Sequence, residues 1–120
     1  MADEITITTG LRLVNGLLEV PSTTKTTKFT QTTARGGGPG VLDIGTSEET
    51  ISFGDCVPGW VELVNLDTTN YVTWGNVTLN LDQKLSANGG RALFEMVSGG
   101  VLIMQADTAT CKVRITALNT

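Results

Sequence analysis

Polar and apolar residues alternate with a period of two over short stretches along most of this chain. The clearest case is Thr110–Ala117, in which Cys111, Val113, Ile115 and Ala117 alternate with threonine, lysine and arginine. A period of two places the apolar residues on one face of an extended chain and the polar residues on the other. The pattern therefore predicts a strand with one buried and one solvated face.

The same kind of pattern recurs in several other short segments, and no window shows a helical period over ten or more residues. These segments are Glu4–Thr8, Val41–Ile44, Thr50–Phe53, Val77–Leu81, Ala92–Met96 and Val101–Ala106. Turn signals separate them roughly every 8–12 residues, which is typical of β-sandwiches. We expect residues 1–120 to form one all-β domain, a jelly-roll-like sandwich of about nine or ten short antiparallel strands.

One apolar segment, Leu11–Val20, allows two interpretations. Its apolar residues fall on both faces of an extended chain, which would suit a strand covered on both sides. Asn15-Gly16 in its middle is a strong turn dipeptide, so Leu11–Val14 and Leu17–Val20 can instead pair as a tight hairpin.

A Thr/Gly-rich arm and loop is expected over residues 22–40. Ser22–Arg35 contains many threonines and only positive charges, which predicts an extended segment with a solvated face. It would be either an edge strand that its lysines protect from aggregation or a contact surface for an acidic partner. Gly36–Gly40 is interpreted as a flexible loop, because it lacks the spacing of a phosphate-binding glycine motif.

The aromatic residues concentrate in Gly59–Gly75. Two apolar runs, Trp60–Leu66 and Tyr71–Trp74, flank the polar link Asp67–Asn70, and this pattern predicts a β-hairpin. We expect its aromatic side chains to pack in the core. The alternative is an exposed aromatic platform for a sugar.

Charge and composition narrow the range of partners. The net charge is −4 with only eight basic residues, which argues against binding nucleic acid through its phosphates. The acidic start of the chain does not resemble a secretory signal, and the apolar run Val101–Met104 is too short to cross a membrane. We expect synthesis in a reducing host cytoplasm, with Cys56 and Cys111 as free thiols.

Catalytic chemistry is nearly absent from the sequence. The chain has no histidine, which excludes histidine-dependent nucleophilic triads and histidine metal sites. Paired carboxylates remain, yet Glu62 and Glu95, the two acids inside predicted strands, are interpreted as facing outward. We therefore expect no enzyme, and no catalytic, cofactor-binding or metal-ligating residues.

From Thr32 onward the chain resembles small structural proteins of tailed bacteriophages. The likeness lies in the order of its parts: a Thr/Gln-rich segment, a glycine stretch, "VLDIGTSEETISFGD", "GWVELVNLDTTNYVTWG", "RALFEM", "VLIMQAD" and a final "CKVRITAL". The resemblance implies a virion component with a β-sandwich fold. The family carries no catalytic motif, so it assigns no site residue.

Together these points favour a capsid decoration (cement) protein on the outer surface of the phage head. Its expected partners are the major capsid protein and further copies of itself, as a dimer or trimer, with neither nucleic acid nor membrane. Lys25, Lys28, Phe29 and Arg35 are the candidate contact residues. The alternatives are a receptor- or carbohydrate-binding module of a head spike or tail fibre, and a head–tail or tail component.

Overall fold

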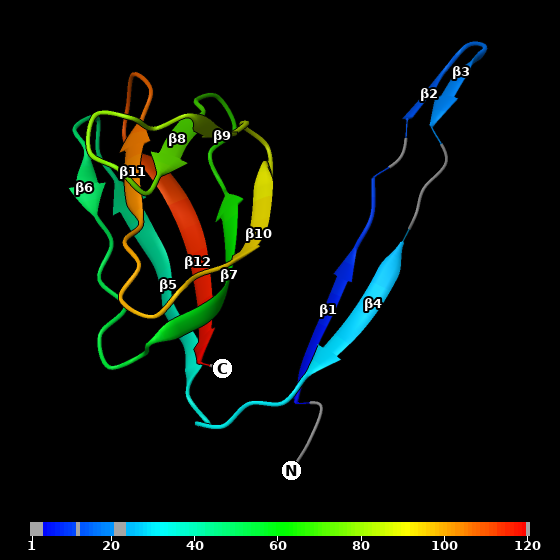
Figure 1. Cartoon of the computed structure of the whole chain (residues 1–120). Coiled ribbons are helices and arrows are strands. Elements are labelled where there is room, and N and C mark those ends of the chain that lie inside the picture. Colours follow the sequence, from blue (N-terminus) through cyan, green and yellow to red (C-terminus); the bar gives the residue numbers. More distant parts are fainter. Residues whose placement is uncertain (1–3, 12, 21–23, 120) are drawn as a thin grey trace. The chain divides into compact units, whose positions relative to one another are not determined.

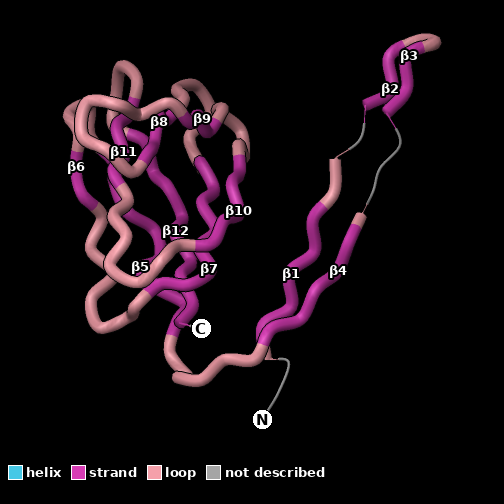
Figure 2. Tube along the Cα trace, in the orientation of Figure 1, coloured by secondary structure: helices cyan, strands magenta, loops and turns pink. Residues whose placement is uncertain are grey.

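The computed structural model describes residues 4–11, 13–20 and 24–119, and all strands within them pair antiparallel. The chain divides into two compact units, Met1–Thr33, here called the N-terminal ribbon, and Ala34–Thr120, here called the sandwich. Figure 2 shows only strands and loops in the described residues. The predicted all-β sandwich is confirmed.

The sandwich contains two four-stranded sheets (Figure 1). The first has the order β10-β7-β12-β5, from β10 (Arg91–Glu95), β7 (Pro58–Asn65), β12 (Cys111–Asn119) and β5 (Gly36–Ile44). The second has the order β6-β11-β8-β9, from β6 (Glu49–Thr50), β11 (Ile103–Ala106), β8 (Val72–Gly75) and β9 (Gln83–Leu85). Both sheets contribute side chains to one core.

The core follows the two-residue period of its strands. In β12 the four residues predicted to face inward are all buried, and Lys112 and Arg114 between them are exposed. The fully buried large side chains from the rest of the sandwich include Ile44, Val61, Leu63, Val72, Leu85, Leu102 and Met104. Removing this much apolar surface from water is what stabilises the sandwich.

The predicted hairpin over Trp60–Trp74 is wrong in its pairing, although both of its runs are strands. β7 pairs with β10 and β12, whereas β8 pairs with β11 and β9, so the link crosses from one sheet to the other. Trp74 belongs to the core, and Trp60 is half-buried. Asp67 still shapes the link, because its Oδ2 accepts hydrogen bonds from the backbone N–H groups of Thr69 and Asn70 at 3.0 and 2.6 Å.

The glycine stretch Gly36–Gly40 is not a loop, which corrects the prediction. It forms the first half of β5 and pairs with β12, with Gly36 opposite Leu118 and Gly40 opposite Ile115. A Cβ on Gly36 would lie 2.8 Å from the carbonyl oxygen of Ala117. At this position only glycine allows the two backbones to come so close, so Gly36 serves strand pairing.

The alternation in Val77–Leu81 also fails to form a strand. The segment is a tight turn, closed by a hydrogen bond from the Asn80 N–H to the Val77 carbonyl at 3.1 Å. Leu79 has a positive φ of 65° and is 89% exposed. Of the expected strand at Thr50–Phe53, only Thr50 lies in a strand, as the second residue of β6. Gln83–Leu85 forms β9.

The N-terminal ribbon consists of two nested two-stranded sheets. β1 (Ile5–Thr9) pairs with β4 (Lys25–Phe29), and between them β2 (Leu13–Asn15) pairs with β3 (Leu18–Val20). The hairpin interpretation of Leu11–Val20 is thus confirmed, with Gly16 (φ 59°) as the first residue of its two-residue turn. The described residues form four strands in the ribbon and eight in the sandwich. This number is larger than the nine or ten strands predicted.

The boundary between the two units lies inside residues 22–40, which were expected to form one arm and loop. The ribbon ends at Thr33, and the glycines that follow belong to β5 of the sandwich. Within Ser22–Arg35, β4 confirms the extended conformation, while Ser22 and Thr23 lie outside the described residues.

Candidate functional site

The β1–β4 pair of the ribbon has two different faces. Its register places three apolar residues on one face, Ile5, Ile7 and Phe29, together with Thr9, Lys25 and Thr27. The other face carries threonines and a lysine, and the hydroxyl oxygens of Thr8 and Thr26 lie 3.0 Å apart. A two-stranded ribbon with one thin apolar face has little core of its own, so its stable form depends on what covers that face.

The four predicted contact residues belong to both units of the chain. Lys25 and Lys28 are both exposed, but they are three positions apart on β4 and therefore point to opposite faces. Phe29 is half-buried opposite Ile5. Arg35 belongs to the sandwich, where its Nη1 donates a hydrogen bond to the backbone carbonyl of Asp55 at 3.0 Å. That these four residues contact a partner stays a prediction.

The most exposed apolar side chains of the ribbon lie around the β2–β3 turn. Leu17 in the turn is 106% exposed, and Leu11, Leu18 and Val14 are 78%, 58% and 54% exposed. We call these four residues the hairpin tip. Val14 pairs with Glu19 and Leu18 pairs with Asn15, so Val14 and Leu18 lie on opposite faces of the hairpin. The sequence carried the signal, apolar residues on both faces beside a turn dipeptide, without showing that they stay uncovered.

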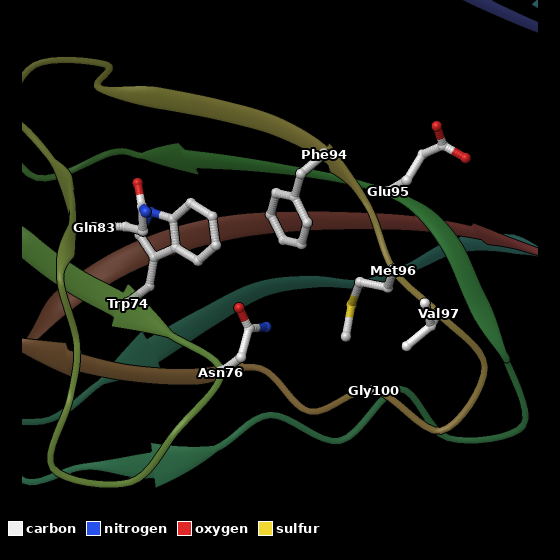
Figure 3. Close-up of a pocket in the computed structure, with 8 residues that line it drawn as sticks. All are labelled: Trp74, Asn76, Gln83, Phe94, Glu95, Met96, Val97 and Gly100. Carbon is white, nitrogen blue, oxygen red and sulfur yellow. The ribbon is translucent and has the colours of Figure 1, made fainter.

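The sandwich has a cleft of about 320 Å³ between β8 and β10 (Figure 3). The eight residues that line it are Trp74, Asn76, Gln83, Phe94, Glu95, Met96, Val97 and Gly100. The rings of Trp74 and Phe94 stack with their centroids 4.6 Å apart and their planes 18° from parallel. This pair fixes an apolar wall that is not filled by the sandwich's own side chains.

Two polar groups belong to residues that line this cleft, the indole N–H of Trp74 and the carboxylate of Glu95. The indole Nε1 of Trp74 is buried and has no acceptor among the described residues. The side chain of Glu95 is exposed on the strand that borders the cleft. A buried N–H without an acceptor is unfavourable.

The aromatic residues do not form the flat exposed platform that sugar binding would require. Trp74 is 8% exposed and stacks on Phe94, while Trp60 lies in the opposite sheet. Tyr71 is 36% exposed, but the Lys84 ammonium covers its ring at 4.7 Å from the centroid. A hydrogen bond with the Asp107 carboxylate, whose charge acts in the same direction, raises the pKa of the Tyr71 hydroxyl.

The groups that catalysis or metal binding would use are dispersed. Within the described ranges, no three histidine, cysteine, aspartate or glutamate side chains gather to hold a metal ion. Cys56 and Cys111 are free thiols, as expected, and burial raises the pKa of both. A thiol with a raised pKa stays protonated at neutral pH and is therefore a poor nucleophile.

Comparison with protein-family models, with curated proteins and with solved structures finds no match for this chain. In the part of the chain that the structure describes, no helix is long and apolar enough to span a membrane. The hairpin tip and the β8–β10 cleft are the two candidate surfaces of the described residues.

Proposed function

We propose that this chain is a non-enzymatic structural protein of a bacteriophage particle, and that it acts as a capsid decoration (cement) protein. The observation that carries the proposal is the contrast between a well-packed sandwich and a ribbon with an exposed apolar tip. The sandwich supplies a stable body that needs no cofactor, and the ribbon supplies surface for contact with other chains. The sequence resemblance to small phage structural proteins supports the same assignment.

A shell protein of this kind binds through many repeated, individually modest contacts. Two-stranded ribbons suit this use, because their open edges and one-sided apolar faces can be completed by a neighbouring subunit. Repetition over a symmetric shell then turns weak single contacts into stable attachment. The expected partners are the major capsid protein and further copies of this chain.

The experiment is to measure the copy number and position of the chain in purified particles from a host that carries its gene. Decoration of the head predicts a copy number comparable to that of the major capsid protein, with density on the outer face of the shell in electron cryomicroscopy. A few copies at a vertex or on the tail would replace decoration with a joining or tail role. Absence from purified particles would overturn the proposal.

The basic residues of the ribbon give a second test of how attachment works. Lys25→Glu with Lys28→Glu reverses charge on both faces of β4 without touching a buried group. If an acidic capsid surface contacts the ribbon, occupancy of the shell should fall and become less sensitive to salt. Unchanged occupancy would show that the lysines only protect the edge strand from aggregation.

A further inference from the structure

We propose that two copies of this chain pair through the edge strand β10 (Arg91–Glu95), antiparallel to each other and about a two-fold axis at Leu93. This pairing rests on the proposed function for the expectation that copies of the chain bind one another. The choice of surface comes from β10 itself: its lack of edge protection, its free backbone groups and the order of its charges.

β10 is the one edge strand of the described sandwich without a device that discourages pairing. The sandwich has four edge strands, β10 and β5 in one sheet and β6 and β9 in the other (Figure 1). β5 contains Pro39, β6 has only two residues, and β9 has three residues that include Lys84. Proline, lysine and short length each protect an edge. β10 has five residues and contains neither proline nor lysine.

Hydrogen bonds at the two ends of β10 fix which of its backbone groups face β7. The Asn65 N–H donates to the Gly90 carbonyl at 2.8 Å. At the other end the Met96 N–H donates to the Gly59 carbonyl at 2.7 Å. Along an antiparallel pair such bonds recur at every second residue. Alternate residues of β10 therefore direct their N–H and C=O groups toward β7, and the residues between them direct theirs away from it.

The residues that bond to β7 are Ala92 and Phe94, which lie opposite Leu63 and Val61. The backbone groups that point away from β7 belong to the other three residues of the strand, Arg91, Leu93 and Glu95. Within residues 34–119 no second strand pairs with β10. This edge of the sandwich thus presents three N–H and three C=O groups in the spacing that a further antiparallel strand requires.

The charges along this edge make β10 complementary to a second copy of itself. Arg91 and Glu95 are exposed, and Leu93 between them is half-buried. Antiparallel pairing about Leu93 places Arg91 of each copy directly opposite Glu95 of the other, with Leu93 opposite its own counterpart. Parallel pairing in the same register would instead place like charges side by side. Charge therefore favours the antiparallel arrangement.

The inward face of β10 suits the same register. Ala92 and Phe94 are half-buried and pack against the core of the sandwich. In the antiparallel pair, Ala92 of each copy lies opposite Phe94 of the other, so a small side chain meets a large one and the ring gains cover from water. A shift of one residue would reverse the faces and lose both matches. A second copy is the occupant that this pattern specifies.

The test uses charge reversals that should prevent pairing singly and restore it when combined. Arg91→Glu gives an edge with two acidic ends, and Glu95→Arg gives an edge with two basic ends. Both side chains are exposed, so each variant should still fold, which urea unfolding checks. The matched control is Arg114→Glu. This arginine is exposed on the interior strand β12, in the same row across the sheet as Arg91.

Sedimentation velocity of the full chain over a range of concentrations measures the association. We expect the wild type and Arg114→Glu to dimerise, and Arg91→Glu and Glu95→Arg each to associate at least about tenfold more weakly. An equimolar mixture of the two β10 variants should form a heterodimer, because each acidic end then meets a basic one. The double variant Arg91→Glu with Glu95→Arg should dimerise as the wild type does, since its charge order is reversed but still self-complementary.

Amide hydrogen exchange followed by NMR tests whether the contact is strand pairing. Protection of the Leu93 N–H should rise with protein concentration, because this group is bonded only in the dimer. Protection of the Ala92 N–H should stay constant, because this group bonds to β7 in either state.

Three results would overturn this pairing. A wild type that stays monomeric at all concentrations would do so, and protection of Leu93 at every concentration would then assign the edge to a strand of the same chain. Reversal variants that dimerise as tightly as the wild type would place the contact on another surface. A mixture of the two variants that stays monomeric would show that the charge order does not direct pairing. All three concern the isolated chain, so they are distinguishable from absence in purified particles, which would overturn the proposed function.

Discussion

The N-terminal ribbon and the sandwich use the same residue pattern for opposite purposes. Both contain strands with apolar residues at every second position. In the sandwich these residues meet a second sheet and become fully buried, as with Val113 and Ile115 of β12. In the ribbon, only Ile5 is buried among the described residues, whereas Ile7 and Phe29 remain half-buried and the hairpin tip is exposed. The comparison teaches that alternation predicts a strand, while burial depends on whether the fold supplies an opposing layer.

The largest difference between the two units is expected in the loss of unfolding free energy when a leucine of each, Leu102 or Leu17, is replaced by alanine. Leu102 is fully buried in the sandwich core, and its truncation should lower the free energy of unfolding by about 2–5 kcal/mol through lost burial and a residual cavity. Leu17 is fully exposed, and its truncation should change that free energy by less than about 0.5 kcal/mol. Urea unfolding of both variants at low protein concentration measures the contrast. Equal effects would contradict it.

Asn65→Leu should have the next largest effect. The side chain is fully buried, and its Nδ2 donates to the carbonyls of Asn70, Leu85 and Ser86 at 3.0–3.2 Å. An apolar replacement leaves these carbonyls without that donor, at a cost of about 2–3 kcal/mol in unfolding free energy. Thr26→Val, which removes the exposed hydroxyl contact with Thr8, should cost less than about 0.5 kcal/mol. Urea unfolding that ranks the two variants in the reverse order would refute this assignment.

The acid sensitivity of the sandwich should include a contribution from Asp67. Hydrogen bonds from the backbone N–H groups of Asn70 and Thr69 lower the pKa of this carboxyl. The stabilisation is therefore complete above the unfolded pKa of about 3.9 and is lost as pH falls through the lower folded value. Asp67→Asn should be less stable than the wild type near neutral pH, with the gap closing below about pH 4. Thermal unfolding across this range tests the sign, and a constant gap would exclude titration of Asp67 as the cause.

Removal of residues 1–33 should have the smallest effect. All members of the hydrophobic core lie between Ile44 and Ala117, so the shortened chain keeps the core complete. We expect its urea midpoint to match that of the full chain at low concentration, within about 0.5 kcal/mol in unfolding free energy. A clearly lower midpoint would show that the ribbon contributes to the stability of the sandwich.

The local part of the prediction succeeded where the signal depends on near neighbours. The last strand and the Asn15-Gly16 hairpin could be predicted, because alternation and turn chemistry act over a few residues. The same rules failed at Val77–Leu81, where alternation falls within a tight turn. Whether a strand pairs with these five residues depends on the rest of the fold, which the five residues do not specify.

The candidate site was less predictable than the fold. Lys25 and Lys28 were chosen for their charge, although strand geometry sends them to opposite faces. For Leu11–Val20 the sequence leaves a strand covered on both sides and a tight hairpin open, and the structure has the hairpin with Leu17 and Leu18 exposed. The cleft joins Trp74 of β8 with Phe94 of β10, which belong to different sheets. Only the packing of the sheets brings such residues together.

The sequence by itself determined that this chain is built of short strands, where most of its turns fall, and which residues of β12 face inward. Tertiary structure decided that β7 and β8 separate into opposite sheets, that Gly36–Gly40 pairs as a strand, and that Met1–Thr33 forms a unit of its own. The physical reason is the range of the interactions. Strand and turn preferences act along the chain, whereas sheet partners and burial depend on residues far apart in sequence.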